Sequence, residues 1–543
     1  MKKEFIIDQS IRYLSIPISI QGILCTVSIY CDSRKVYEFQ IPVLPDAREP
    51  YVYDFMAYLP ISPDFWGKLS LEGDFTEAFA AAVATAANIE LSQAEPRNRP
   101  HIHFAPDTGW INDPNGLIYH DGVYHMYYQY NPFHIEWGNM SWGHAVSSDL
   151  LHWTQCDAVL FPDEEGVIFS GSAIENTKGL LDLPQRSLLY FYTCVGEASE
   201  WSRNQPCVQK VAYSTDDGYT LHKMKTVVPA LSKENRDPKV FWHEATKAYI
   251  MCMWLEENDF VLLRSHNLEQ WELTQRLCLD KGFECPNLFE LTTQAGDSKW
   301  FLWTADGYYY EGQFDGWLFK TDGIRREAWC GETLYAAQIF SGINDRTVMI
   351  PWFRTRVRNN KYRGVMGIPR ELYLEQKSGN TQLFLQPVQE YVEQKKLLFK
   401  TSIMDLYQHA IPEGDSHAYQ TEYRIQDDGV IEVVVMCSNN KTAITCNLFG
   451  TQIRYEGESG MLFVDRVCKM VMNENRSEEC QIEADEFYIG TNAAVISMII
   501  DTNLLEIGYG YGKIYAAELE MTDKTDSIKV ASNTLFSMEV YVL

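Results

Sequence analysis

The sequence has no cysteine pair with the C-x-x-C spacing, no apolar run near the length of a membrane span, and few basic residues for its size. Its 13 Cys residues are scattered, which indicates reduced thiols and speaks against a disulfide framework or a zinc site. The 46 Lys and Arg residues are outnumbered by 74 Asp and Glu residues. A net charge of −28 speaks against nucleic acid and anionic membrane surfaces as partners, because both attract basic proteins.

The N-terminus also lacks the apolar run and the small-residue cleavage site of a secretory signal. This absence, together with the reduced thiols, predicts a cytoplasmic protein. What the chain has in quantity is apolar and aromatic residues, at 46% and 13% of 543 residues. That is enough for several packed cores, and the aromatic rings suit either an all-β core or the binding of a sugar.

Alternating apolar and polar residues recur along most of the chain and predict an all-β protein in three parts. Residues 1–95 are expected to form a small N-terminal accessory domain, mainly β, with a hairpin over residues 20–45 and a helix over residues 75–89. The Pro-containing residues 92–100 predict a linker. Residues 400–543 hold many short alternating stretches with little helical periodicity, and predict a C-terminal β-sandwich.

The central residues 101–385 contain a weak internal repeat. The stretch SSDLLHW at residues 147–153 returns as SHNLEQW at residues 265–271, and STDDG lies between them at residues 214–218. Strand-turn units that recur about every 50 to 65 residues are typical of propeller blades, and this part of the chain has room for about five of them. Chance also produces such turns in β-rich proteins, so the repeat alone does not decide the fold.

Three carboxylates in the central part, Asp113, Asp237 and Glu284, stand among apolar or aromatic residues, and each is followed by Pro within two positions. Such surroundings desolvate a carboxylate unless a partner such as Arg236 neutralises it. Hydrolysis of a glycoside requires one carboxylate and one carboxylic acid beside the bond that breaks. The stretch NDPNG at residues 112–116 is also good turn chemistry, so a purely structural role for Asp113 stays open from these residues alone.

Four motifs follow one another along the central part of the chain. They are WINDPNG at residues 110–116, FSGSA at residues 169–173, RDP at residues 236–238 and ECP at residues 284–286. In this order they closely resemble the signature motifs of glycoside hydrolase family 32, which contains invertases, inulinases, levanases and fructan exohydrolases. The resemblance covers residues 101–385 strongly and the C-terminal part weakly.

The resemblance implies that residues 101–385 are a five-bladed β-propeller catalytic domain, joined to the C-terminal β-sandwich. It implies Asp113 as the nucleophile, Glu284 as the acid/base, and Asp237 as the residue that holds fructose hydroxyls and stabilises the transition state. Asp237 is expected to stay ionised beside Arg236. No metal and no cofactor are implied. The family positions around the fructose subsite correspond here to Asn112, Gln129, Trp137, Ser170 and Arg236.

Three further expectations concern residues near the motifs. His101 and His103 lie on one face of a strand pattern, but two histidines without further ligands are more often structural than metal-binding. Residues 333–336 depart from the family pattern and are expected to lie away from the three acids. Residues 139–142 are expected to form an outer rim, where water and an acceptor sugar compete for the intermediate.

The expected activity is retaining hydrolysis of terminal β-D-fructofuranosides through a fructosyl-enzyme intermediate. The small-molecule sugar or fructan substrate is sucrose, a short fructo-oligosaccharide, inulin or levan. The motifs have no compact Lys/Arg cluster beside them, so a neutral sugar is preferred to a phosphorylated one. Two alternatives stay open: a fructosyltransferase with the same three acids, and a catalytically silent fructan-binding protein. The oligomeric state is not specified by the sequence, with a homodimer as one option.

Overall fold

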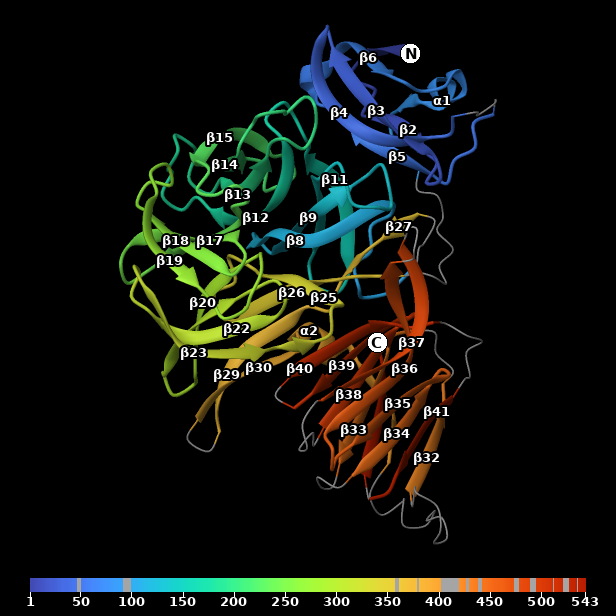
Figure 1. The fold of residues 1–543 in the computed structure, drawn as a ribbon, viewed down its shortest axis with the longest axis vertical. Coiled ribbons are helices and arrows are strands. Elements are labelled where there is room, and N and C mark those ends of the chain that lie inside the picture. The colour runs from blue at the N-terminus through green and yellow to red at the C-terminus, as the bar shows by residue number, and fades with distance from the viewer. Residues whose placement is uncertain are drawn as a thin grey trace.

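The structure of the chain, a computed structural model, is mostly β, with 61% of the residues in strands and 3% in helices. The predicted all-β class is therefore confirmed. Figure 1 shows an N-terminal, a central and a C-terminal group of sheets. None of the helices in the described residues is long and apolar enough to cross a bilayer. The structure describes residues 1–45, 50–90, 99–356, 361–377, 380–401, 419–425, 429–437, 442–472, 478–488, 495–510, 512–520, 527–534 and 536–543.

The described residues up to 90 form two small sheets around a shared apolar core, at the top of Figure 1. The strand orders are β1-β6-β3-β4 and β5-β2-β7. The predicted hairpin over residues 20–45 is confirmed as β3 and β4, whose turn contains Asp32 and Ser33 at positive φ. The elements are β1 (Lys2–Ile7), β2 (Tyr13–Ile18), β3 (Ile23–Cys31), β4 (Arg34–Val43), β5 (Phe55–Pro60), the 3-10 helix η1 (Pro63–Phe65), β6 (Gly67–Gly73), α1 (Glu77–Ala82) and β7 (Ala84–Ala86).

The helix predicted over residues 75–89 is shorter than expected. Helix α1 covers only Glu77–Ala82, and the chain then extends so that Ala84–Ala86 pair antiparallel with residues 13–15 of β2. The ladder hydrogen bonds to β2 outweigh the helical preference of this alanine-rich stretch, as tertiary context commonly does. Most of the predicted linker, residues 92–100, lies outside the described residues.

The described part of residues 109–387 forms five consecutive sheets, each built around four antiparallel strands in chain order. The first strands of neighbouring sheets lie side by side, β8 against β12, β12 against β16 and β25 against β8, so the last sheet returns to the first. The strands are β8 (Gly109–His120), β9 (Val123–Asn131), β10 (Ser141–Ser147) and β11 (Trp153–Leu160); β12 (Val167–Glu175), β13 (Leu188–Val195), β14 (Cys207–Ser214) and β15 (His222–Val228); β16 (Arg236–His243), β17 (Ala248–Glu256), β18 (Asp259–Ser265) and β19 (Glu272–Cys278); β20 (Asn287–Thr292), β21 (Ser298–Trp303), β22 (Tyr308–Phe314) and β23 (Phe319–Glu327); and β25 (Leu334–Ile339), β26 (Thr347–Phe353), β29 (Arg370–Lys377) and β30 (Asn380–Pro387), with the short β27 (Tyr362–Arg363) and β28 (Val365–Met366) pairing with β8 and β26.

The weak repeat of the sequence marks one structural position. Residues 147–153 connect β10 to β11, residues 265–271 connect β18 to β19, and residues 214–218 connect β14 to β15. All three therefore join the third strand of a sheet to its fourth. Leu150 and Leu268 take φ values of 65° and 64°, and the carbonyl of each accepts a hydrogen bond from the indole N–H of the Trp that follows. The two longer copies of the repeat are thus structurally equivalent.

The described C-terminal strands form two large sheets that share one apolar core. One sheet has the order β24-β40-β39-β38-β33-β42-β31, where β24 comes from the central part and pairs parallel with β40. The other has the order β32-β41-β34-β35-β36-β37. The elements are β24 (Trp329–Cys330), α2 (Gln389–Gln394), β31 (Lys396–Lys400), β32 (Tyr419–Arg424), β33 (Ile431–Cys437), β34 (Ala443–Leu448), β35 (Thr451–Glu456), β36 (Met461–Met472), β37 (Glu478–Tyr488), β38 (Val495–Asp501), β39 (Leu504–Tyr509), β40 (Lys513–Glu518), β41 (Ser527–Ser532) and β42 (Phe536–Val542).

A buried charged cluster joins the C-terminal sheets to the start of the central part. The carboxylate of Asp501, at the end of β38, is fully buried. It accepts hydrogen bonds from the backbone N–H groups of His101, Ile102 and His103 at distances of 2.8 to 3.1 Å. The ring of His103 also contacts Asp501 through Nδ1 at 3.0 Å and Glu506 through Nε2 at 3.1 Å. These contacts agree with the structural role predicted for the two histidines.

Candidate active site

The first candidate residues lie on a β-bulge in the inner strand β8. The register between β8 and β9 shifts between Ile111 and Pro114, which leaves Asn112 and Asp113 as the irregular residues. The turn that the composition of residues 112–116 favours does not form, because β8 continues through this stretch. A bulge bends a strand and redirects its side chains, and Pro, which lacks an N–H, suits such a position. Similar register shifts occur at residues 169–170 of β12, 237–238 of β16 and 336–337 of β25.

These irregular strands surround a single cavity of about 370 Å³. All eight residues predicted for the site line it, although they are spread over 173 positions of the sequence, from 112 to 284. They are Asn112, Asp113, Gln129, Trp137, Ser170, Arg236, Asp237 and Glu284. Five further lining residues were not assigned to the site from the sequence: Phe169, Phe283, Tyr335, Trp352 and Arg354.

The carboxylate of Asp113 is held by neighbouring donors. Ser170 Oγ donates to Oδ2 of Asp113 at 2.8 Å, and the thiol of Cys285 lies 3.6 Å from the same oxygen. Burial, followed by the charge of Glu284, raises the pKa of Asp113, whereas hydrogen bonds with Ser170 and Asn112 lower it. The donors therefore orient the carboxylate and favour its ionised form against the cost of burial.

The guanidinium of Arg236 binds Glu284 through two of its nitrogens, while Nη1 donates to the carbonyl of Glu234 at 3.0 Å. Nε and Nη2 of Arg236 both donate to Oε1 of Glu284, at 2.9 and 2.7 Å. The ring of Trp254 lies 3.9 Å from the guanidinium carbon and supports it by a cation–π contact. On the other side, the hydroxyl of Tyr335 donates to Oε2 of Glu284 at 2.5 Å. Both oxygens of Glu284 are thus oriented by protein groups.

Asp237 is buried and has a φ of 65°, a left-handed conformation that is uncommon for a residue with a side chain. Its backbone N–H donates to Thr193 Oγ1 at 2.9 Å, and its Oδ2 accepts from the backbone N–H of Cys285 at 3.0 Å. Burial and then Glu284 raise the pKa of Asp237 to about 7, although Arg236 lowers it. Arg236 thus favours the ionised form of Asp237, as expected, whereas burial and the charge of Glu284 act against it.

The thiol of Cys285 links two of the acids. It lies 3.6 Å from Oδ2 of Asp113 and 3.5 Å from Oδ2 of Asp237. Burial and then the charges of Asp237, Asp113 and Glu284 raise the pKa of this thiol well above its usual value. Cys285 is therefore a neutral donor between two carboxylates, and the two candidate acids it contacts belong to one compact group.

Two expectations about the edges of the site are wrong. Residues 333–336 do not lie away from the acids, since Tyr335 binds Glu284 directly. Residues 139–142 do not line the cavity, and three of them are buried inside the protein. The mouth is instead bordered by Trp137, whose surface is 59% exposed, and by Arg354, whose guanidinium carbon lies 3.8 Å from the Tyr335 ring centroid. The stretch WFR at residues 352–354, which places an aromatic residue and a cation at the end of β26, was an available signal for this side.

We expect a Tyr335→Phe variant to lose roughly 10- to 100-fold in kcat/KM, because a hydrogen bond to a charged group contributes about 1.5–3 kcal/mol. The measurement is steady-state fructose release from sucrose. Tyr130→Phe is the matched control, since the Tyr130 hydroxyl binds the carbonyl of Thr108 and does not line the cavity. Equal activity of the two variants would mean that Tyr335 does not orient Glu284 during catalysis.

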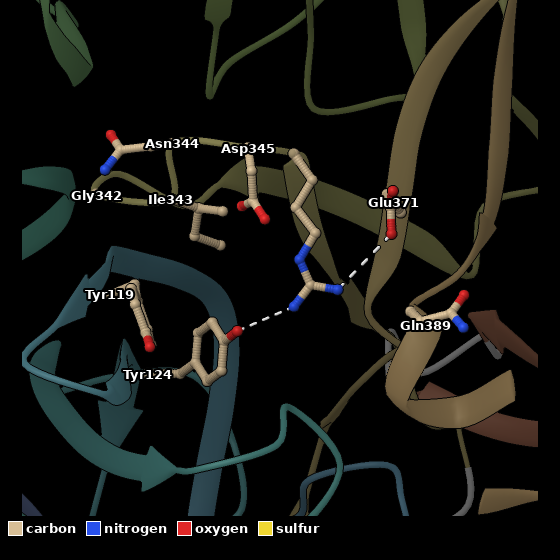
Figure 2. A pocket seen from close by; sticks show the side chains of 9 residues that line it. Tyr119, Tyr124, Gly342, Ile343, Asn344, Asp345, Glu371 and Gln389 are labelled. Atoms are coloured by element: carbon tan, nitrogen blue, oxygen red, sulfur yellow. Dashed lines mark hydrogen bonds and ion pairs between the residues drawn. The ribbon is translucent and has the colours of Figure 1, made fainter. Parts of the chain in front are cut away.

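A larger cavity of about 650 Å³ lies near the other end of β8, roughly 20 Å along the strand from Asp113. Figure 2 shows Tyr119, Tyr124, Asp345, Glu371 and Gln389 around it. The cation that extends into this cavity is already neutralised by protein groups, because Arg346 binds the Tyr124 hydroxyl at 3.0 Å and Glu390 at 2.5 Å. The three candidate acids are absent from its lining. Volume alone therefore does not identify the active site.

The described residues also bring together one group of three possible metal ligands, His120, Asp121 and Asp217. The group lies near the same end of β8. Two of the three already have protein partners, since Arg186 forms an ion pair with Asp121 and the His120 ring contacts Glu175 through Nδ1 at 3.2 Å. This surface cluster does not contribute to the lining of the cavity with the three acids.

Comparisons with known proteins agree with the motifs. Residues 103–387 match the pattern described as "Glycosyl hydrolases family 32 N-terminal domain", which is more than half of the chain. A levanase from Bacillus subtilis (strain 168) is 32% identical over 431 residues, covering 72% of this chain. The chain spans 61% of the length of that levanase.

Solved structures show the same fold. A fructofuranosidase from Schwanniomyces occidentalis complexed with fructose aligns with a TM-score of 0.66 and 24% identity, over 82% of this chain and 98% of that one. A glycoside hydrolase family 32 structure from Bifidobacterium adolescentis aligns with a TM-score of 0.65 and 18% identity, over 100% of this chain and 99% of that one. At these identities the likeness concerns the fold alone, whereas the sequence match extends over all the segments that carry the three acids. The chain belongs to glycosyl hydrolase family 32.

Proposed function

We propose that this chain is a retaining β-fructofuranosidase that releases terminal fructose from sucrose and short fructo-oligosaccharides. The observation that carries the proposal is the convergence of Asp113, Asp237 and Glu284 on one cavity of about 370 Å³, a size typical of small-molecule sites. The family membership supports the same reaction class. Inulin and levan are further candidate substrates, and their use depends on contacts outside the cavity.

In the proposed reaction, the carboxylate of Asp113 attacks the anomeric carbon of the fructosyl unit while Glu284 protonates the departing glycosidic oxygen. The bond to the leaving sugar breaks and an ester bond to Asp113 forms. Glu284, now ionised, takes a proton from water, whose oxygen attacks the same carbon. The ester bond to Asp113 breaks, Asp113 becomes a carboxylate again and fructose is released. The two displacements on one carbon retain its configuration.

The surrounding polar groups support this scheme. Asp237 can accept hydrogen bonds from fructose hydroxyls, and such bonds strengthen as charge develops in the transition state. The Nε2 atom of Gln129 is buried without a partner among the described residues, and it lines the cavity as an available donor. A buried donor without a partner destabilises the protein. A hydrogen bond from this donor to a sugar hydroxyl therefore contributes more to the free energy of binding than an exposed contact would.

The architecture that brings the acids together is part of the proposal. The five central sheets are the blades of a five-bladed propeller, and the three acids lie in its funnel. The contacts between the last sheet and the first, which close the ring, support this architecture. Residues 101–385 are then the catalytic domain, residues 1–95 the accessory domain, and residues 400–543 a β-sandwich of two sheets around one core.

Product analysis at high sucrose concentration tests the function. A β-fructofuranosidase is expected to release glucose and free fructose in near parity. An excess of glucose over free fructose would instead identify the fructosyltransferase alternative, because the missing fructose is passed to another sugar. Release of neither product would leave only a silent fructan-binding protein. NMR of the fructose that is released first tests retention. A retaining enzyme is expected to release β-fructofuranose, and the other forms of fructose are expected to appear later.

A further inference from the structure

The loop that carries Trp137 is anchored in the N-terminal sheets. Residues 132–140 connect β9 to β10. Phe133 and Ile135 of this loop are 0% and 2% exposed and belong to the apolar core of the N-terminal sheets. The Phe133 ring centroid lies 4.5 Å from that of Phe39 in β4. Two residues beyond Ile135, the largely exposed Trp137 lines the mouth of the cavity.

Polar contacts from the same strand fix the end of the loop. The backbone N–H of Gln40 in β4 donates to Oδ1 of Asn139 at 2.8 Å, and Nδ2 of Asn139 donates to the carbonyl of Gln40 at 2.9 Å. Nδ2 of Asn139 also donates to Oδ1 of Asn131 at 3.0 Å. Asn131 in turn donates from its Nδ2 to the carbonyl of Glu136, directly before Trp137, at 2.9 Å. A continuous chain of hydrogen bonds therefore runs from β4 to the residue next to Trp137.

The central part holds the opposite side of the loop. Nη1 of Arg363 donates to Oε2 of Glu136 at 2.7 Å, and the Arg363 guanidinium carbon lies 5.2 Å from the Trp110 ring centroid. The loop is thus fixed between β27 and β4. The apolar anchors and the Asn139 contacts come from the N-terminal side, so the position of Trp137 depends on both parts of the chain.

We propose that the N-terminal sheets, residues 1–90, act as a positioning module for the substrate, with β4 fixing the loop that presents Trp137 at the cavity mouth. This inference rests on the proposed function, because it takes Trp137 as a sugar contact. An indole packs on the C–H face of a sugar only when its ring is held at a defined place. The three acids lie on other segments, so the module sets sugar affinity and leaves the bond-breaking step unchanged.

An Asn139→Gly variant tests the proposal. Gly removes the three side-chain hydrogen bonds and accepts the φ of 45° found at Asn139, so the backbone is not strained. We expect KM for sucrose to rise roughly 5- to 10-fold with kcat within about twofold, since neutral hydrogen bonds of this kind contribute modest free energies. We also expect faster amide hydrogen exchange across residues 132–140 of the full chain.

Tyr13→Phe is the matched control. It removes the hydrogen bond at 2.9 Å from the Tyr13 hydroxyl to Asp157 of β11, which is a contact between the N-terminal sheets and the central part away from the Trp137 loop. KM, kcat and exchange over residues 132–140 are expected to stay at wild-type values. If KM rises equally in Tyr13→Phe and Asn139→Gly, the effect comes from a general weakening of the contact between the N-terminal sheets and the central part. This result would overturn the proposal.

A double-mutant cycle separates positioning from other effects. If Asn139 acts through Trp137, then adding Asn139→Gly to Trp137→Ala should leave KM unchanged. A full additional rise of KM in the Trp137→Ala background would overturn the proposal, as would unchanged hydrogen exchange in Asn139→Gly. If the wild-type chain releases no fructose, the proposed function fails, and hydrogen exchange still decides whether β4 holds the loop.

Discussion

An Asp113→Asn variant is expected to lose roughly 10⁴- to 10⁶-fold in kcat toward sucrose while keeping its fold and its KM within a few-fold, because removing a catalytic nucleophile costs factors of this size. The amide is a poor nucleophile and cannot form the ester with the anomeric carbon. Its oxygen can still accept the hydrogen bond from Ser170, which is 2.8 Å from the present carboxylate. The loss should therefore appear in the chemical step and not in sugar binding.

Asp121→Asn is the matched control for this change. Asp121 is an exposed carboxylate near the far end of β8 with a φ of 46°, which Asn tolerates well. Its activity is expected to stay near that of the wild type. The decisive measurement is single-turnover fructose release, with folding checked by thermal unfolding. If Asp113→Asn keeps more than about one hundredth of the wild-type kcat, Asp113 is not the nucleophile.

Replacement of Asp501 by Ala is expected to lower the free energy of unfolding by roughly 3–5 kcal/mol, the usual effect of removing one partner from a buried ion pair. The change would leave three backbone N–H groups, at residues 101–103, without their acceptor. It would also leave His103 without one of its two carboxylate partners. Because these contacts join the C-terminal sheets to the central part, the substitution is expected to weaken the interface between these two parts.

The same cluster predicts how stability depends on pH. Burial lowers the pKa of His103, but hydrogen bonds with Asp501 and Glu506 outweigh it and raise the pKa to about 9. Burial raises the pKa of Asp501, but the bonds from His101 and His103 hold it well below its usual range. The His103 contribution is complete below pH 6.5 and is lost as the pH rises through about 9. The Asp501 contribution is present above pH 3.8 and is lost as the pH falls.

Urea unfolding across this range measures both effects. The midpoint should be highest between about pH 4 and pH 6.5 and should fall toward pH 9.5. In Asp501→Ala the fall at high pH should be smaller, because His103 has lost one of the partners that raise its pKa. Asp465→Ala is the control, since this half-buried carboxylate lies away from His103 and accepts a hydrogen bond from the backbone of Gln452 at 2.5 Å. If the urea unfolding midpoint of Asp501→Ala equals that of the control, the contacts of Asp501 with residues 101–103 do not stabilise the protein.

Local sequence patterns predicted the elements that depend on near neighbours. The hairpin of β3 and β4 follows from alternation and a polar turn, and the repeat at residues 147–153 and 265–271 occupies equivalent connections. The same patterns failed where distant strands compete for the backbone. Residues 84–86 leave helix α1 to pair with β2, and the stretch NDPNG continues β8 with a bulge because β9 supplies the ladder beside it.

The candidate site divides in the same way. The four motifs contain six of the eight predicted residues that line one cavity, and the resemblance supplies Gln129 and Trp137 from the stretches between the motifs. The contacts among these residues were not readable from the motifs. Arg236 stands next to Asp237 in the chain but bonds to Glu284, and Tyr335 reaches Glu284 from a different sheet. Adjacent residues of an extended strand point to opposite sides, so neighbours in sequence are often not partners in space.

By itself, the sequence determined the all-β class, the family of the central part and the residue types that the reaction needs, because these follow from periodicity and from motifs of a few neighbouring residues. Only the tertiary structure decided which groups hold each acid and how the N-terminal sheets reach the mouth of the cavity. The cavity joins residues 112 and 354 and the Trp137 loop joins residues 40 and 139, pairs far apart in the chain. Such contacts depend on how separate sheets pack, which no short stretch of sequence encodes.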